Sequence, residues 1–243
     1  LELVLPPSAL QHDDLFKLRV HWHGGSGDRI PSYVRRVVQD DHTKLFCAQV
    51  WQPATAYAWR HPQPYRGGNS PAYRAPLIYE AHTGMAQEKH GVGTYIEFRD
   101  QVLPRILDAG YNTVQLMAVM EHPYYGSFGY HVSSFFAASS RFGTPEELKS
   151  LIDTAHGLGL RVIIDLVHSH AVKNEVEGLS CFDGTPYQYF HAGERGSHVA
   201  WDSRCFDYAK PEVLHFLLSN CRFWLDEYKV DGFRFDGITS MLY

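Results

Sequence analysis

The stretch TPEELKSLIDTAHGLGLRVIIDLV, residues 144–167, joins a predicted helix to a predicted strand. Thr144 is suited to cap the helix, Pro145 suits its first turn, and Glu147 completes a capping box three residues after Thr144. The run RVIIDLV is almost continuously apolar, which is typical of a strand covered on both faces of its sheet. The stretch therefore predicts a capped helix followed by a buried strand.

The same alternation of strand and helix extends in both directions. Strands are predicted at residues 77–82, 112–119, 161–167 and 229–236, and helices at 94–110, 144–159 and 211–228. Either a doubly wound sheet or a (β/α)8 barrel satisfies this pattern. Because no GxGxxG or GxxxxGK motif follows a strand, we favour the barrel. The predicted fold class is α/β, the first half of a (β/α)8 TIM barrel.

The N-terminal part of the chain has a different pattern. Short β-like runs alternate with turn clusters such as HGGSGD and QDDHT over residues 1–61, which predicts a small antiparallel sheet. Residues 62–76 are rich in Pro, Gly, Asn and Ser and are predicted to be a linker. The barrel part then occupies residues 77–243.

Composition excludes several classes of protein. Of 243 residues, 44% are hydrophobic and 20% charged, which excludes intrinsic disorder, and no apolar run approaches the ~20 residues of a membrane helix. A net charge of −5 gives no basic surface for nucleic acid, so neither nucleic acid nor a membrane is an expected partner. Four cysteines without CxxC spacing are expected to be reduced and mostly buried, and the absence of a leader and an initiator Met suggests a fragment of a cytoplasmic protein.

Polar residues mark the ends of the predicted strands, where the active sites of both candidate folds lie. In GFRFD, Arg234 and Asp236 are two residues apart and so share one face, while Phe233 and Phe235 share the other. Burial of an Arg and an Asp is costly unless they are paired or used. A carboxylate kept ionised at a strand end could be a covalent nucleophile, but a purely structural ion pair is an equally good interpretation.

The run DLVHSH ends the third predicted strand. Asp165 shares a face with its apolar neighbours two residues away, and His170 lies just beyond the strand. His168 and His170 could form half of a metal site, which we disfavour because further ligands on later strands would be needed. In the aromatic segment 121–149, Tyr130 next to Gly129 could present its ring to a sugar or simply pack in a loop.

These segments resemble the α-amylase family of glycoside hydrolases and transglycosylases. DLVHSH is similar to that family's first motif, and GFRFD to its second, Gly-x-Arg-x-Asp. The segments SFGYHVSSFFAASSRFGTPEELK, WDSRCFDY and LIYEAH resemble most the 1,4-α-glucan branching enzymes of this family, in their eukaryotic-type branch. The resemblance extends over roughly residues 75–243, and residues 1–61 would fit the end of the β-sandwich carbohydrate-binding module that precedes the barrel in these enzymes.

The resemblance implies roles for five residues. Asp236 would be the catalytic nucleophile and Arg234 would hold it in place and ionised, while Asp165 and His170 would bind the sugar at the cleavage subsite. Tyr130 would be the stacking platform there. The implied partner is an α-1,4-glucan (glycogen, amylose or starch), and no metal or organic cofactor is implied.

The implied reaction is a retaining double displacement that transfers an oligosaccharide to a glucan 6-hydroxyl. A hydrolase of the same family and a non-catalytic glucan-binding protein are the alternatives. The family's acid/base Glu and its late His-Asp pair belong to strands that would follow Tyr243, and half a barrel exposes unpaired strand edges. These 243 residues alone are therefore expected to be inactive and to fold poorly.

Overall fold

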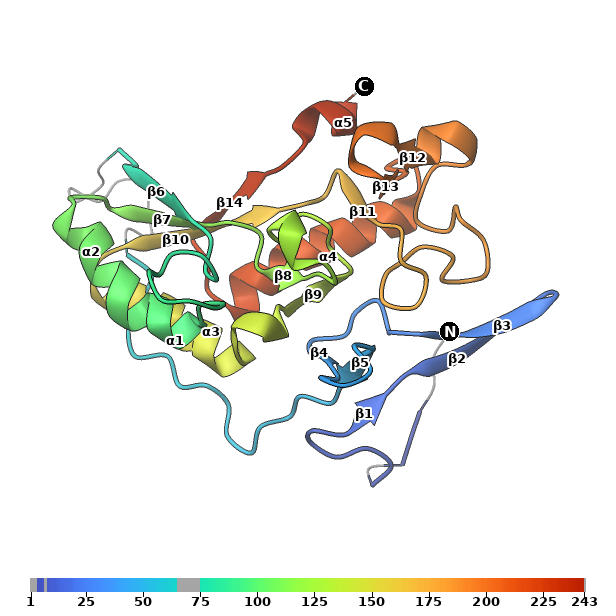
Figure 1. Ribbon diagram of the computed structural model, residues 1–243, viewed down its shortest axis with the longest axis horizontal. Helices are drawn as coiled ribbons and strands as arrows, with labels where there is room; N and C mark the ends of the chain where they lie inside the picture. The colour runs from blue at the N-terminus through green and yellow to red at the C-terminus, as the bar shows by residue number, and fades with distance from the viewer. Residues whose placement is uncertain (1–3, 7, 65–74, 243) are drawn as a thin grey trace.

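A four-stranded parallel sheet forms the centre of the computed structural model, which describes residues 4–6, 8–64 and 75–242 (Figure 1). Its strands are β6 (Ile78–Ala81), β7 (Thr113–Leu116), β10 (Arg161–Leu166) and β14 (Gly232–Phe235), in the order β14-β10-β7-β6. All three neighbouring pairs are parallel. The four predicted strands are confirmed, each shorter than predicted by a few residues.

Helices connect these strands as predicted. Helix α3 (Pro145–Gly157) precedes β10, and α4 (Pro211–Glu227) precedes β14. The predicted capping box is present, since the Glu147 amide donates to Thr144 Oγ1 at 3.2 Å and the Thr144 amide donates to Glu147 Oε2 at 2.7 Å. A short helix, α5 (Ile238–Leu242), follows β14.

The helix predicted over 94–110 is interrupted. It consists of α1 (Tyr95–Glu97), the π-helical segment η1 (Phe98–Val102) and α2 (Leu103–Asp108). Pro104 has no N–H to donate to the preceding turn, which explains why regular α-helical hydrogen bonding fails just before it.

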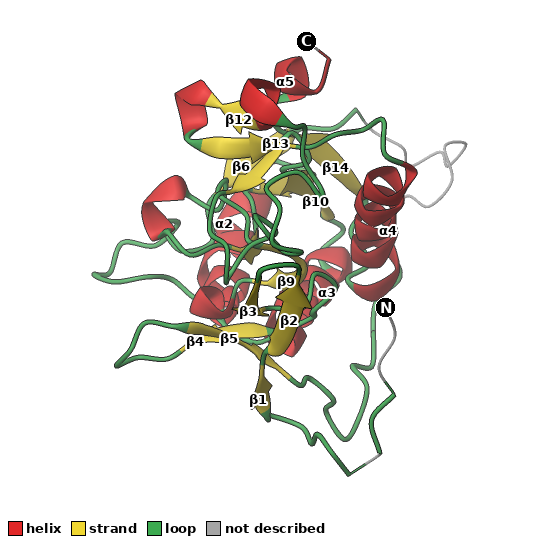
Figure 2. Cartoon of the chain, turned by 90° about the vertical axis from the view of Figure 1, so that its right-hand side faces the viewer, coloured by secondary structure: helices red, strands yellow, loops and turns green. Residues whose placement is uncertain are grey.

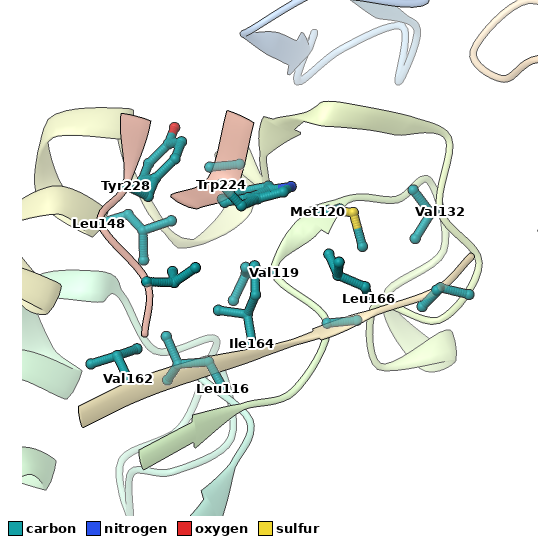
Figure 3. Close-up of a cluster of buried hydrophobic side chains, with 14 of the residues drawn as sticks. Leu116, Val119, Met120, Val132, Leu148, Val162, Ile164, Leu166, Trp224 and Tyr228 are labelled. Carbon is teal, nitrogen blue, oxygen red and sulfur yellow. The ribbon is translucent and has the colours of Figure 1, made fainter. Parts of the chain in front are cut away.

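The core lies between the sheet and the helices on one side of it. Val162, Ile164 and Leu166 point from β10 toward Leu148 of α3 and Trp224 of α4, and all five are buried (Figure 3). Helices on either side of β10 in the sequence therefore cover the same face of the sheet. The consecutive strand order also differs from that of a doubly wound sheet, in which the order reverses.

The loops that follow β7 and β10 contain strands that the sequence did not predict. Two small antiparallel sheets form there: β8 pairs with β9, and β11 and β12 both pair with β13. These strands have two to five residues, too few for a periodic pattern to stand out from a loop. The strands are β8 (Met120–Glu121), β9 (Ser134–Ala138), β11 (His170–Val172), β12 (Ser197–His198) and β13 (Ser203–Cys205), and the 3₁₀ turns are η2 (Tyr125–Ser127), η3 (Ser140–Phe142), η4 (Gly193–Gly196) and η5 (Val199–Trp201).

The N-terminal part contains two small antiparallel units (Figure 2). One sheet has the order β1 (Leu15–Phe16), β5 (Phe46–Gln49), β4 (Val37–Gln39), and β2 (Leu18–Trp22) pairs with β3 (Gly25–Arg29) as a hairpin. The turn predicted at HGGSGD is confirmed only for its first two residues, because β3 begins at Gly25. A Cβ on Gly25 would lie 2.7 Å from the indole nitrogen of Trp22, so glycine lets the Trp22 ring lie across this strand.

The antiparallel sheet packs on the rest of the molecule. Val37, Phe46 and Ala48 form a buried cluster with Ala137 of β9. Residues 65–74 of the predicted linker lie outside the described residues. All four cysteines are free thiols, as expected, but they are half-buried rather than mostly buried. Within the described residues, no helix is both long and apolar enough to cross a membrane.

Candidate active site

A row of polar side chains crosses the sheet near the carboxyl ends of its strands. Glu80 on β6 lies opposite Gln115 on β7, and Asp165 on β10 lies opposite Arg234 on β14. The amide nitrogen of Gln115 donates to Glu80 Oε1 at 3.1 Å and to Asp165 Oδ1 at 2.9 Å. Each of the four central strands therefore contributes one member of a single hydrogen-bonded row.

Asp165 is the buried centre of this row. Its side chain is fully buried, and its second oxygen accepts from the Tyr130 hydroxyl at 2.6 Å and from Arg234 Nη1 at 3.0 Å. Burial raises the pKa of Asp165 above its ordinary value, while the hydrogen bond from Tyr130 and the charge of Arg234 oppose that rise. Both carboxylate oxygens are used by neighbouring side chains.

Arg234 connects this buried carboxylate to Asp236. The same guanidinium nitrogen donates to Asp236 Oδ1 at 2.9 Å, and the Asp236 amide donates to the carbonyl of Leu166 at 2.9 Å. Burial would lower the pKa of Arg234, but the charges of Asp165 and Asp236 outweigh it and raise that pKa. The guanidinium thus remains charged between two carboxylates, and the Asp236 side chain remains 21% exposed.

The predicted division of faces on β14 is confirmed. Arg234 and Asp236 contact each other on the face that carries Asp165. Phe233 and Phe235 pack against the hydrophobic core on the other face. The alternation of a regular strand therefore places the charged pair away from the helices.

His170 is held as a neutral ring. Its Nε2 donates to the carbonyl oxygen of Tyr130 at 3.0 Å, and its Nδ1 accepts from the Ser169 hydroxyl at 2.9 Å. Burial lowers the pKa of His170 to about 4, so the ring carries no charge near neutral pH. His168 turns elsewhere, since its Nε2 contacts Asn220 Oδ1 at 2.9 Å beside helix α4. The two histidines therefore share no ligand position.

The position of Tyr130 depends on a close contact between the backbone at Gly129 and the carbonyl group of Ala118. Gly129 has a φ of +92°, and a Cβ there would lie 2.1 Å from the carbonyl oxygen of Ala118. Only glycine fits both the conformation and the space. Burial raises the pKa of the Tyr130 phenol, so the hydroxyl remains protonated and can donate to Asp165.

These groups border one cavity of about 570 Å³. Tyr130, His170, Trp201 and Asp236 line it together with four other residues, whereas Asp165 lies beneath Tyr130 and Arg234 and is not part of the lining. The structure thus brings the five predicted site residues together: three of them line the cavity, and Asp165 and Arg234 lie behind the lining and bond to it. Their roles in catalysis and sugar binding stay predictions.

Metal-type side chains do not gather here. In the described ranges, no three His, Cys, Asp or Glu side chains are arranged to hold a metal ion. Glu121 is buried and accepts from the amides of His122 and Ser140, which fits a structural role in the loop after β7. Arg204, in the segment WDSRCFDY, donates to Ser180 and is not part of the cavity lining.

Sequence reasoning missed Gln115 and Glu80. A signal for Gln115 was present, because it is the one strongly polar residue in the otherwise apolar run VQLMAV, and a buried amide needs partners. Glu80 lies in the segment LIYEAH, but no pattern in the sequence shows that it reaches Gln115.

The α/β fold agrees with comparisons to known proteins. The model of the alpha amylase catalytic domain matches residues 99–192. A curated relative from Yarrowia lipolytica, named 1,4-alpha-glucan-branching enzyme, is 51% identical over 99% of this chain and 35% of its own length. The chain belongs to the α-amylase family.

Other relatives in the family carry the same enzyme name. The protein from Rhizophagus irregularis is 56% identical over 89% of this chain and 31% of its own length, and that from Solanum tuberosum is 54% identical over 96% and 27%. A solved structure from Salmonella typhimurium, assigned as an alpha amylase, has a TM-score of 0.69 and 26% identity over 90% of this chain and 34% of its own. The chain spans about a third of the length of these relatives.

Proposed function

We propose that the protein is a 1,4-α-glucan branching enzyme in which Asp236 is the nucleophile. The observation that carries this proposal is the placement of Asp236, a partly exposed carboxylate beside a charged guanidinium, on the cavity that Tyr130 and His170 also line. The relatives that support it are named for this activity. The substrate would be an α-1,4-glucan such as glycogen, amylose or starch.

In the first step, the Asp236 carboxylate would attack the anomeric carbon of an α-1,4 linkage. A bond from that carbon to an Asp236 oxygen forms as the bond to the leaving O4 breaks, and O4 takes a proton from a general acid. In the second step, a glucan 6-hydroxyl displaces Asp236 and loses its proton to the same group, which is then a base. The product is an α-1,6 branch with the original anomeric configuration.

The other site residues would prepare this attack. Asp165 holds both the Tyr130 hydroxyl and Arg234, and Arg234 in turn fixes one oxygen of Asp236. The neutral His170 ring would offer its edge to a sugar hydroxyl on the cavity wall, and Tyr130 would stack on the sugar at the cleavage subsite. No step requires a metal ion.

Further proposals concern the architecture. The four-stranded sheet would be the first half of a (β/α)8 barrel, whose remaining strands would pair with the free edges of β14 and β6. Residues 1–61 would be the end of a β-sandwich carbohydrate-binding module, residues 62–76 a linker, and residues 77–243 the barrel part. A cytoplasmic location stays a prediction, and some relatives are named chloroplastic/amyloplastic.

The test replaces Asp236 with Ala in the full-length protein and follows amylose. The wild type should lower the absorbance of the amylose–iodine complex while reducing ends barely rise, because every bond broken is replaced by a branch. The Asp236→Ala variant should lose this activity by several orders of magnitude. Asp226→Ala is the matched control, because Asp226 is a surface aspartate of α4, 67% exposed, whose ion pair among the described residues is with Arg222.

Each outcome decides between functions. A rise in reducing ends that matches every broken bond would show a hydrolase of the same family. Binding of amylose without any change in iodine colour would show a glucan-binding protein. Near-wild-type transfer by Asp236→Ala would refute the assignment of the nucleophile.

A further inference from the structure

A tryptophan at the tip of a hairpin lines the cavity beside Asp236. Strand β12 pairs with β13, and Trp201 lies in the turn η5 between them. Trp201 is 40% exposed, although it is the largest side chain of the cavity lining. A tryptophan ring that remains exposed at a cavity is a candidate contact for a ligand, because tryptophan is mostly buried in folded proteins.

The Trp201 ring is held in one orientation. The His198 ring stacks on it with centroids 4.0 Å apart and an angle of 2° between the planes. His198 is fixed in turn, because its Nε2 contacts the Ser240 hydroxyl at 2.9 Å. Since His198 covers one face of the indole, the exposed area of Trp201 comes from its other face and its edges.

The backbone around Trp201 is held as well. Asp202 has a positive φ of +44° and forms an ion pair with Lys173. Strand β13 also pairs with β11, the strand that begins at His170. On the other side, a Cβ on Gly237 would lie 3.2 Å from the Trp201 ring, so the ring abuts the residue that follows Asp236. The indole is therefore placed before any ligand binds.

We propose that Trp201 is a second stacking platform for the glucan, next to the cleavage subsite where Tyr130 stacks. This inference rests on the proposed function, because a glucan is its ligand. The cavity of about 570 Å³ is within the ~300–1,000 Å³ range of small-molecule binding sites. The apolar face of a glucosyl unit complements the open indole face.

Trp201 contributes to binding and not to the chemical step. No hydrogen bond joins its side chain to Asp165, Arg234 or Asp236 in the described part of the chain. An interaction made equally in the bound substrate and in the transition state lowers KM and leaves kcat unchanged. Removal of the ring should therefore raise KM for amylose about 10- to 100-fold, with kcat changed less than about threefold.

The experiment compares three variants of the full-length protein. Trp201→Ala removes the ring, Trp201→Phe keeps a smaller platform, and Val199→Ala changes a 95% exposed residue of the same turn that does not line the cavity. Affinity for maltoheptaose is measured by calorimetry in an Asp236→Asn background, which prevents turnover. We expect about 10- to 100-fold weaker binding for Trp201→Ala, less than about fivefold for Trp201→Phe and no change for Val199→Ala.

A second measurement covers the possibility that Trp201→Ala does not fold. Stacking of a sugar on an indole changes its fluorescence, so maltoheptaose should change the emission of the Val199→Ala control and change that of Trp201→Phe much less. Equal affinity of Trp201→Ala and Val199→Ala, or an equal emission change in Trp201→Phe and Val199→Ala, overturns the inference. Either result leaves the Asp236 assignment untouched, whereas persistent transfer by Asp236→Asn overturns the proposed function and not the platform.

Discussion

Asp153, a buried aspartate on α3, accepts hydrogen bonds from the segment that follows the N-terminal sheet, and its replacement should let that segment separate from α3. Asp153 is fully buried, and its carboxylate accepts from the Tyr57 hydroxyl at 3.0 Å, the Arg60 amide at 3.1 Å and the His61 amide at 2.9 Å. The Arg60 guanidinium adds a fourth donor at 3.0 Å. Within the segment 51–63, residues 57–61 are therefore fixed to α3 largely through one side chain, while Trp51 separately donates to Glu146 of the same helix.

The loss of stability expected on substitution of Asp153 follows from the hydrogen bond that each donor loses. The Arg60 side chain is 63% exposed, so its ion pair is screened by solvent and adds little. The two amides and the Tyr57 hydroxyl bond a charged acceptor, for which a hydrogen bond contributes about 1.5–3 kcal/mol. Asp153→Ala, which leaves these donors without an acceptor, should cost about 3–5 kcal/mol, and Asp153→Asn about 2 kcal/mol.

Hydrogen exchange followed by mass spectrometry is the suitable assay, because it reports opening of residues 51–63 separately from global unfolding. In full-length protein, a loss of about 3 kcal/mol should speed exchange in this segment about a hundredfold. Tyr57→Phe, which removes one donor, should give a smaller effect than Asp153→Asn. Asp226→Ala on the exposed face of α4 is the control and should change nothing.

The stabilisation that Asp153 gives to this segment should also depend on pH. Burial would raise the pKa of Asp153, but the hydrogen bonds from Arg60, His61 and Tyr57 outweigh it and the pKa lies below the ordinary value. The stabilisation is therefore present at neutral pH and is lost as pH falls through the folded-state pKa, below about 4. If Asp153→Ala exchanged residues 51–63 no faster than Asp226→Ala at neutral pH, the reasoning would be refuted.

Three further substitutions test other parts of the structure. Arg234→Lys should lower kcat about a hundredfold or more, with KM little changed, because the lysine side chain is one atom shorter and does not place a nitrogen where Nη1 of Arg234 bonds both carboxylates; wild-type kcat would contradict this. Gly129→Ala should destabilise by about 3 kcal/mol in denaturant unfolding, because of its positive φ and the contact with the Ala118 carbonyl, whereas Gly24→Ala, with a φ of +85° and no neighbour within 4 Å, should cost about 1 kcal/mol. Burial lowers the pKa of His168 to about 4, so between pH 6.5 and 4 the unfolded chain takes up a proton at this residue that the folded chain does not. Falling pH therefore destabilises the folded protein by up to about 1.4 kcal/mol per pH unit through His168. His168→Gln should remove this part of the acid destabilisation in unfolding curves measured between pH 6.5 and 4.

The repeating part of the fold was predictable because its signals are local. Thr144, Pro145 and Glu147 mark a helix start through backbone chemistry that lies within four residues, and the structure forms those bonds. Strands covered on both faces, such as β10, are recognised from their continuous apolar residues. Strand order could not be read this way, because whether β7 lies beside β6 or elsewhere depends on contacts between distant residues.

The candidate site was only partly predictable for a related reason. The alternation of one strand sufficed to place Arg234 and Asp236 together, because both belong to β14. The bonds from Gln115 to Glu80 and Asp165 join three strands, so they depend on the register between strands, which no local pattern encodes. The contribution of Trp201 likewise depends on a hairpin whose two strands together have five residues.

The carboxylates near the cavity differ in what they can do. Asp165 cannot protonate a leaving oxygen, because it is fully buried and both of its oxygens accept hydrogen bonds within the protein. Asp202 lines the cavity, but the hydrogen bond from Lys173 lowers its pKa, so it stays ionised. Asp236 is the nucleophile in our proposal and must itself be ionised. A retaining mechanism needs a second carboxyl group about 5–5.5 Å from the nucleophile.

None of these three aspartates meets that need, and the topology indicates where such a group would enter. Strand β14 is an edge of the sheet, so a further parallel strand can pair with it directly beside Asp236. The carboxyl end of such a strand would lie beside the carboxyl ends of β10 and β14, next to the cavity that Asp236 lines. We therefore expect the general acid to come from a strand on the free edge of β14, and the described residues to supply the nucleophile and the groups that hold it.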